Sequence, residues 1–279
     1  MNRTAHATLT YMAPPSEPLY NYYVMEPPPG RPASNEVPDP REVIIRNLRE
    51  EECRLDVHGF ELVSFSPSVK DIYDAAERAA VFDPEVAALV KRCTGALEAR
   101  VFSPFLRGPE AQRRNPGSIS APSSTVHVDY THESGPIFFE QILGDDADRL
   151  RGRRYAIINV WRPIVGPLQD RPLTVCDART VAASDLIRSK VYSRLDEQGL
   201  NSPAGKIYEA ETYAVLHNPA HRWYYAPEMM PDEALLLKNY ESAMTGASRF
   251  TPHTSFTDPN APAQPVPRAS IEVRVLAVW

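Results

Sequence analysis

The chain has 279 residues and a formal net charge of −6, from 30 Lys plus Arg against 36 Asp plus Glu. This length can bury one large core, and the scattered basic residues give no electrostatic footprint for nucleic acid. No apolar run reaches the roughly 18–20 residues of a membrane-spanning helix, and the N-terminus lacks the apolar stretch of a secretion signal. The cysteines Cys53, Cys93 and Cys176 are widely separated, which argues against a disulfide framework or a zinc knuckle. We therefore expect a soluble cytoplasmic protein.

Proline is over-represented, with 28 Pro against 12 Gly, and many of these prolines lie in residues 12–40 and 252–267. A residue without a backbone N–H favours loops over long helices. We expect residues 1–40 to form a Pro/Tyr-rich extended segment that covers an opening, either on its own subunit or across a homodimer. Tyr20, Tyr22 and Tyr23 argue against full disorder, since aromatic area tends to be buried.

Up to residue 122 the apolar pattern mixes both periodicities. Strands are predicted at residues 42–46, 55–63 and 101–105. Helices are predicted at residues 71–80 and 84–97, and a loop at residues 107–122. Asp83 is the expected N-cap of the second helix, with Pro84 at its first position.

From residue 125 the pattern changes to strands separated by turn signals. Strands are predicted at residues 125–130, 154–163, 207–216, 222–225 and 270–279. Helices are predicted at residues 135–143, 185–195 and 232–240. This density of strands predicts a mainly β core of sandwich or barrel type with flanking helices. We expect one domain over residues 41–279, with the candidate site in residues 120–279.

Two segments of the sequence are candidates for a metal site. His127 and Asp129 are separated by one residue, so on a strand both side chains project from the same face and can chelate one ion. His253 would complete a set of two imidazoles and one carboxylate. That set is the facial triad that binds non-haem Fe(II) and leaves coordination positions open.

Other histidines compete for the third place, and a His-x-Asp pair is common in proteins without a metal. His217 and His221 have the spacing of a helical metal pair, but Asn218-Pro219 between them opposes a helix. His132 follows Asp129 in a turn and fits a loop residue near the mouth of the site. His58 is the remaining competitor.

The pair Arg268 and Ser270 favours His253 as the third ligand. A guanidinium forms two parallel hydrogen bonds with a carboxylate, and a serine hydroxyl adds another, which suits a dicarboxylate co-substrate. On pattern alone, the polar face of Arg268, Ser270, Glu272 and Arg274 fits a solvated edge strand equally well. Its position just beyond His253 favours an interior pocket instead. Asn159 and Trp161 share a strand face and are candidates for lining that pocket, Asn159 as a residue that binds the co-substrate, although structural roles fit both as well.

These segments resemble the cephalosporin 7α-methoxylase-like and gibberellin-desaturase-like oxygenases of bacterial and fungal secondary metabolism. The matching blocks are residues 127–135, 158–164, 172–177, 221–229, 232–242, 252–259 and 268–274. The resemblance implies a double-stranded β-helix, or jelly-roll, fold that uses Fe(II), 2-oxoglutarate and O2. It assigns His127, Asp129 and His253 as iron ligands and Arg268 as the anchor of the distal carboxylate of 2-oxoglutarate.

The resemblance extends to the chemistry of the substrate. The N-terminus and the length are most similar to fungal members that act on meroterpenoids, including members that form endoperoxides. We expect an apolar terpenoid, meroterpenoid or polyketide substrate, modified by hydroxylation, desaturation or endoperoxide formation. Its pocket would be lined by Tyr130, Phe138, Trp161, Trp223 and Tyr225. A small anionic substrate would instead need a second cationic anchor, for which Arg274 is the candidate, although Glu272 beside it can neutralise its charge.

Two other classes of function share part of this pattern. A metal-dependent hydrolase or isomerase would use the triad without needing Arg268. A non-enzymatic jelly-roll binding protein would not need His127, Asp129 and His253 to converge. Conversion of 2-oxoglutarate to succinate by the purified protein with Fe(II) distinguishes the oxygenase from both.

Overall fold

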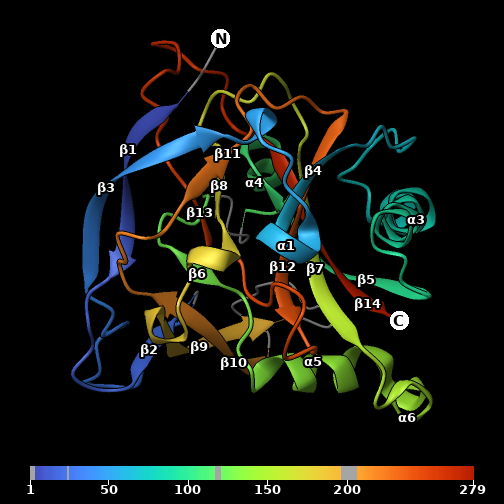
Figure 1. The fold of residues 1–279 in the computed structure, drawn as a ribbon, viewed down its shortest axis with the longest axis horizontal. Coiled ribbons are helices and arrows are strands. Elements are labelled where there is room, and N and C mark those ends of the chain that lie inside the picture. Colours follow the sequence, from blue (N-terminus) through green and yellow to red (C-terminus); the bar gives the residue numbers. More distant parts are fainter. Residues whose placement is uncertain (1–3, 24, 117–120, 196–205) are drawn as a thin grey trace.

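The computed structural model describes residues 4–23, 25–116, 121–195 and 206–279. Strands dominate these residues and form two sheets (Figure 1). The larger sheet has nine strands in the order β1 (Ala5–Met12), β3 (Pro38–Asn47), β11 (Trp223–Tyr225), β8 (Leu173–Cys176), β13 (His253–Ser255), β6 (His127–Val128), β10 (Lys206–Val215), β9 (Leu186–Leu195) and β2 (Leu19–Tyr22). The smaller sheet has five, in the order β4 (Phe60–Ser64), β12 (Glu233–Glu241), β7 (Tyr155–Pro163), β14 (Ser270–Val278) and β5 (Glu98–Arg107). The predicted mainly β fold is confirmed.

The helices are short apart from two. They are α1 (Leu55–His58), α2 (Ala75–Glu77), α3 (Asp83–Thr94), α4 (Pro109–Arg114), α5 (Ser134–Leu143) and α6 (Ala147–Leu150), with a π-helical turn at Arg78–Phe82 and 3₁₀ turns at Leu48–Glu50, Gly144–Asp146, Ala178–Thr180 and Ala183–Asp185. In the described residues, no helix combines the length and apolar character that crossing a membrane requires.

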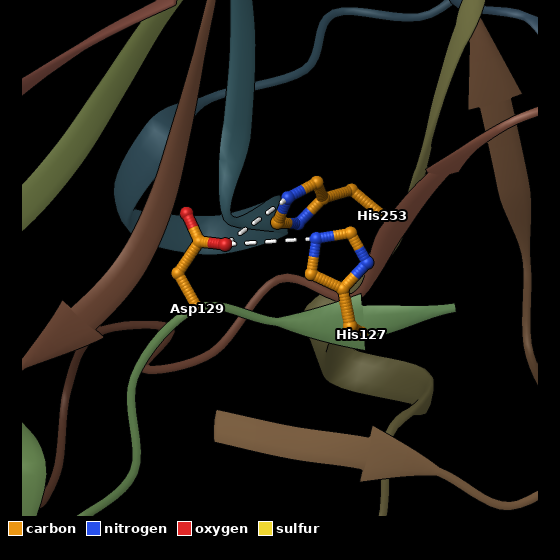
Figure 2. Close-up of side chains that lie close together, drawn as sticks. All are labelled: His127, Asp129 and His253. Carbon is orange, nitrogen blue, oxygen red and sulfur yellow. Dashed lines mark ion pairs between the residues drawn. The ribbon is translucent and has the colours of Figure 1, made fainter. Parts of the chain in front are cut away.

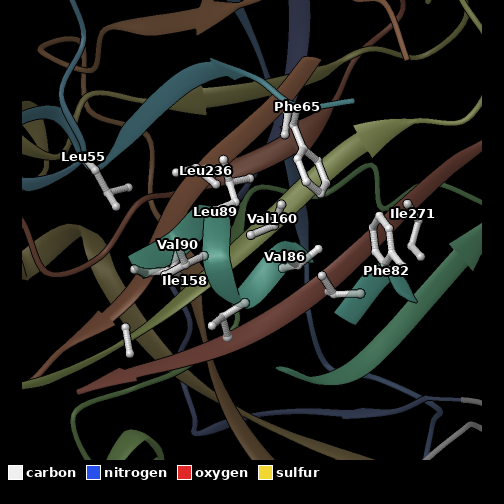
Figure 3. Close-up of a cluster of buried hydrophobic side chains, with 14 of the residues drawn as sticks. Leu55, Phe65, Phe82, Val86, Leu89, Val90, Ile158, Val160, Leu236 and Ile271 are labelled. Carbon is white, nitrogen blue, oxygen red and sulfur yellow. The ribbon is translucent and has the colours of Figure 1, made fainter. Parts of the chain in front are cut away.

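The five-stranded sheet separates a purely apolar core from the site. Helix α3 covers one face of this sheet, where Val86, Leu89 and Val90 pack against Ile158 and other apolar side chains of β7, β12 and β14 (Figure 3). Because side chains alternate along a strand, Asn159 of β7 projects from the other face. The strands next to α3 therefore also supply the side chains of the polar interior.

The nine-stranded sheet is so strongly curved that its edge strand β1 also contacts the residues just before β6 and just after β10. The backbone N–H of Val126 donates to the carbonyl of Thr10 in β1, and Met12 forms a bridge with Leu216. A second apolar core fills this curl, including Tyr11 and Trp223, both fully buried. Residues 5–12 and 19–22 of the Pro/Tyr-rich segment are thus strands of the sheet.

Several predicted elements differ from the structure. Residues 185–195 and 232–240, predicted as helices, form strands β9 and β12. Residues 55–58, predicted as part of a strand, form a helical turn that ends at Gly59, whose φ of 90° suits glycine. Asp83 is not an N-cap, because the preceding π-helical turn continues directly into α3. Part of the predicted loop at 107–122 is helix α4, and residues 117–120 lie outside the described residues.

Candidate metal centre

Strand pairing brings His127 and His253 together from distant parts of the sequence. His127 of β6 lies directly opposite His253 of β13 in the antiparallel register, and the two rings are 4.4 Å apart between centroids. Directly opposed residues on adjacent strands share a face of the sheet. Asp129 immediately follows β6, and its carboxylate lies against both rings (Figure 2).

The three side chains converge on one point through specific atoms. Asp129 Oδ1 lies 3.5 Å from His127 Nε2 and 4.0 Å from His253 Nε2. One ligand atom from each residue lies within 4.8 Å of the other two. Among the described residues, this is the group of His, Cys, Asp and Glu side chains whose geometry suits a metal ion.

The hydrogen bonds of the two histidines use Nδ1 and leave both Nε2 atoms available as metal ligands. His127 Nδ1 donates to the carbonyl of Thr125 at 2.8 Å, and His253 Nδ1 donates to the carbonyl of Thr251 at 3.0 Å. A proton on Nδ1 of a neutral imidazole leaves the lone pair on Nε2. Burial and the neighbouring His127 lower the pKa of His253 to about 4, so its ring is neutral at pH 7.

The carboxylate of Asp129 divides its two oxygens between different partners. Oδ1 faces the imidazoles, whereas Oδ2 accepts hydrogen bonds from Asn159 Nδ2 at 2.8 Å and from Arg274 at 3.2 Å. Burial opposes the charge of Asp129, but Arg274 and the two histidines outweigh it and keep the pKa of Asp129 well below its usual range. The backbone N–H of Asp129 donates to Asn239 Oδ1 at 3.2 Å.

This arrangement fits an iron(II) ion. It offers two imidazole nitrogens and one ionised carboxylate oxygen on one side of a common point, with each ligand fixed by a further hydrogen bond. Burial opposes a charge on His127, but the neighbouring Asp129 raises the pKa of His127 above its usual value, so a metal ion would replace a proton between the two side chains. His127, Asp129 and His253 are the residues that would bind the ion.

Arg268 lies in the same pocket, a cavity of about 50 Å³. Arg268 Nε donates to Ser270 Oγ at 3.1 Å, its NH1 donates to the carbonyl of Arg171 at 2.7 Å, and its guanidinium lies over the Trp161 ring at 4.9 Å. Burial, together with the nearby Arg107, lowers the pKa of Arg268 to about 9. A bound anion would relieve this cost, so the environment favours a carboxylate ligand. The pocket is lined by Arg107, Ser123, His127, Asp129, Trp161, Leu173, His253, Thr254, Ser255, Arg268, Glu272 and Arg274.

The other predicted pocket residues fall into two groups. Tyr130 contacts Phe138 edge-on at 4.8 Å and lies 5.6 Å from the Arg274 guanidinium, beside the candidate site. Trp223 and Tyr225 instead lie in the core inside the curl of the large sheet, and they are not among the residues that line the metal pocket. Asn159 contacts Asp129, so its position suits a role at the metal ligand more than at the co-substrate.

The competing histidines have other partners. His221 Nε2 donates to Asp185 Oδ2 at 3.1 Å, and its Nδ1 accepts from the Tyr11 hydroxyl at 3.2 Å. His217 packs edge-on against Tyr11. His132 Nε2 accepts from Arg249, and His58 Nδ1 accepts from the backbone N–H of Arg54. These contacts explain the four histidines without a metal.

Two contacts of Asp129, from Asn239 and from Arg274, were not predicted from the sequence. Asn239 lies where the register of β12 and β7 shifts, and such an irregularity leaves no local signal. Arg274 was considered only as an anchor for an anionic substrate. Its alternation with Arg268 and Ser270 placed it on the polar face, but its pairing with Asp129 depends on the fold.

Comparisons with known proteins agree with this geometry. A family described as an oxidoreductase/YMDC permease-like domain matches residues 9–278. The chain is 34% identical to the Fe(II)/2-oxoglutarate-dependent dioxygenase nvfI of Aspergillus novofumigatus, over 91% of this chain and 89% of that protein. It is 33% identical to the hydroxylase/desaturase efuI of Hormonema carpetanum, over 85% and 83%. A solved structure of the iron and alpha-ketoglutarate-dependent endoperoxidase NvfI superimposes with a TM-score of 0.84 at 30% identity, covering 99% of this chain and 98% of that one.

Proposed function

The chain belongs to the Fe(II)/2-oxoglutarate-dependent dioxygenases, and on this basis we propose that His127, Asp129 and His253 bind its iron and Arg268 binds its 2-oxoglutarate. The enzyme uses Fe(II), 2-oxoglutarate and O2, and its core is a jelly roll, both as the sequence predicted. The observation that carries the ligand assignment is the approach of Asp129 Oδ1 to His127 Nε2, at 3.5 Å, and to His253 Nε2, at 4.0 Å.

The residues of the chain supply binding and orientation. The backbone carbonyls of Thr125 and Thr251 fix the two imidazoles, and Asn159 fixes the carboxylate. Iron held by these residues would supply the activation of O2, which is consumed as 2-oxoglutarate is oxidatively decarboxylated to succinate and CO2 and a substrate C–H bond is oxidised. The role of the protein is therefore to position the metal, the co-substrate and the substrate, and to exclude water.

Arg268 is the proposed anchor of the distal carboxylate of 2-oxoglutarate. It is buried, and Ser270 Oγ accepts a bond from its Nε, so the guanidinium has a fixed direction. The serine hydroxyl can in turn donate to an anion bound beside it. A carboxylate there would form a charge-assisted pair in a site shielded from water.

We propose an apolar terpenoid, meroterpenoid or polyketide substrate. Tyr130 and Phe138 supply aromatic surface next to the site, and Arg274, the candidate anchor for an anionic substrate, is engaged with Asp129. Relatives named as a hydroxylase/desaturase and as an endoperoxidase support hydroxylation, desaturation or endoperoxide formation as the reaction.

A homodimer and a cytoplasmic location complete the proposal. An interface between copies of the chain would cover exposed apolar side chains of the large sheet such as Ile44, at 48% exposure, or Ile207, at 61%. Light scattering on the purified protein checks this, and a mass of one chain would contradict it.

The function is tested by succinate formation. The purified protein, reconstituted with Fe(II) and given 2-oxoglutarate and O2, is expected to form succinate, and His127→Ala is expected to lose this turnover while keeping its fold by circular dichroism. Apolar polycyclic metabolites should accelerate succinate formation, whereas small sulfonates and carboxylates should not. Equal turnover in the wild type and His127→Ala would contradict the ligand assignment.

A further inference from the structure

Arg274 is a half-buried cation, with 18% of its side chain exposed, and among the described residues it has a single hydrogen-bond partner. It lies on β14 just after a register shift and is opposite Asn159 of β7. Its guanidinium lies 4.7 Å from the centre of the Phe105 ring and 5.6 Å from that of Tyr130. In the described part of the chain, its one hydrogen bond goes to Asp129 Oδ2 at 3.2 Å, and its Nε has no partner. The two aromatic rings thus hold the guanidinium against Asp129.

Two donors from neighbouring strands meet on the same oxygen of Asp129. Asn159 Nδ2 and Arg274 both donate to Oδ2, while Oδ1 faces the two imidazoles. We propose that Arg274 is a positioning residue which, together with Asn159, retains Oδ2 so that Asp129 offers one oxygen to the divalent ion. This inference rests on the proposed assignment of His127, Asp129 and His253 as the metal ligands.

Asp129 needs such a positioning residue because a free carboxylate can rotate and change how it binds a metal. A carboxylate can bind a metal through one oxygen or through both. Binding through both oxygens would occupy a position that the facial triad leaves open for other ligands. Charge-assisted bonds to Oδ2 prevent Asp129 from turning, and they order the carboxylate before the ion arrives.

The guanidinium has a second, opposing effect on metal affinity. A cation beside the site repels a divalent ion, which would weaken binding. We infer that the ordering of Asp129 affects metal affinity more than this repulsion does. The positive charge of Arg274 is balanced by its ion pair with Asp129 and by contacts with two aromatic rings. Removing Arg274 should therefore weaken metal binding.

The alternative role for Arg274 is to bind an anionic substrate or 2-oxoglutarate. In that case its removal would change the requirement for those molecules and leave the affinity for the metal alone unchanged. A metal titration without co-substrate distinguishes the two roles.

The experiment is isothermal titration calorimetry of the metal-free, full-length protein with Mn²⁺ alone. Arg274→Gln is expected to bind Mn²⁺ about tenfold more weakly than the wild type, as is typical when the partner of a metal ligand is lost. Arg274→Lys, which keeps the charge and is the less disruptive change, should lose less affinity. Because Asn159 shares the same acceptor, the double variant Asn159→Ala/Arg274→Gln should lose more than the product of the two single losses.

Arg107→Gln is the matched control. Arg107 lines the same pocket, but its NH1 donates to the carbonyl of Ala121. Its removal tests loss of a nearby positive charge without loss of a bond to Asp129, so the Mn²⁺ affinity of Arg107→Gln should equal or slightly exceed that of the wild type.

Several results would overturn the inference. Unchanged or tighter Mn²⁺ binding by folded Arg274→Gln or Arg274→Lys would do so, as would an equal loss in Arg107→Gln. If the wild type shows no single Mn²⁺ site, or if His127→Ala binds Mn²⁺ equally well, the ligand assignment itself fails and this inference fails with it.

Discussion

Two pairs of histidines in this protein lie beside a carboxylate, and only one pair is arranged to bind a metal. His127 and His253 lie on adjacent strands, each donates from Nδ1 to a backbone carbonyl, and both Nε2 atoms face Asp129. His217 and His221 lie in one loop, next to Asp185 and Tyr11. Both regions thus contain two imidazoles and one aspartate carboxylate.

The difference lies in which nitrogens remain available. At the second pair, Trp223 Nε1 donates to the Tyr11 hydroxyl, which donates to His221 Nδ1, and His221 Nε2 donates to Asp185. Both ring nitrogens of His221 are therefore used in a chain of hydrogen bonds that joins β1, β11 and the turn before β9. A histidine becomes a candidate ligand when one nitrogen is fixed by the backbone and the other is free and aimed at a shared point.

The largest expected effect is on metal affinity at the first pair. His127→Ala and Asp129→Ala remove a ligand, so Fe(II) affinity measured by anaerobic equilibrium dialysis should fall by more than about 100-fold, beyond the loss typical of an outer partner. His217→Ala is the control and should retain the iron. Loss of iron from His217→Ala with retention by His253→Ala would show that the third ligand has been misassigned.

The next effect concerns the co-substrate. Arg268→Ala should raise the 2-oxoglutarate concentration needed for half-maximal succinate formation at least tenfold, because loss of a buried charged pair costs about 2–5 kcal/mol. Arg268→Lys keeps the charge but not the two-pronged geometry and should be intermediate. Iron affinity without co-substrate should stay unchanged in both variants. An unaltered 2-oxoglutarate requirement in Arg268→Ala would contradict the assignment.

At the second pair, the expected effect is on stability. His221→Ala removes the acceptor of the Tyr11 hydroxyl and one of the donors to Asp185, which keeps its bonds from Asn218 and Ala182. Loss of these two bonds at a largely buried site should lower the free energy of unfolding by about 1–3 kcal/mol. Urea unfolding measures this, and iron binding should not change. If His221→Ala has normal stability and no longer binds iron, then the pair His217 and His221, and not His127 and His253, belongs to the metal site.

The smallest effect is expected at Trp223. Trp223→Phe keeps most of the aromatic volume but loses the hydrogen bond to Tyr11, which should lower the free energy of unfolding by about 1 kcal/mol. The dependence of the reaction rate on substrate concentration should be unchanged, since Trp223 lies in the core inside the curved large sheet. A changed substrate dependence at normal stability would return Trp223 to the substrate pocket.

The sequence predicted which residues lie together at the candidate site better than it predicted the elements around them. His127 and Asp129 are two residues apart on a strand, so local geometry already joins them, and Arg268 with Ser270 follows the same rule. The contacts of Asn159 and Arg274 with Asp129 join strands about 30 to 145 residues away from it in sequence, and no spacing rule reaches that far.

The wrongly predicted helices have tertiary causes. Residues 233–241 are rich in helix-forming residues such as Ala234, Leu235 and Lys238, but they form a strand between β4 and β7 that is buried on both faces. A continuous apolar run of this kind does not distinguish a helix from a buried strand. Residues 186–195 become a strand because the full length of β10 pairs with them.

The most direct test of the iron site is anomalous X-ray diffraction at the iron absorption edge from crystals grown anaerobically with Fe(II). We expect one strong anomalous peak within coordination distance of His127 Nε2, His253 Nε2 and one oxygen of Asp129. A peak at His217 and His221, or one from which Asp129 or His253 is missing, would contradict this expectation.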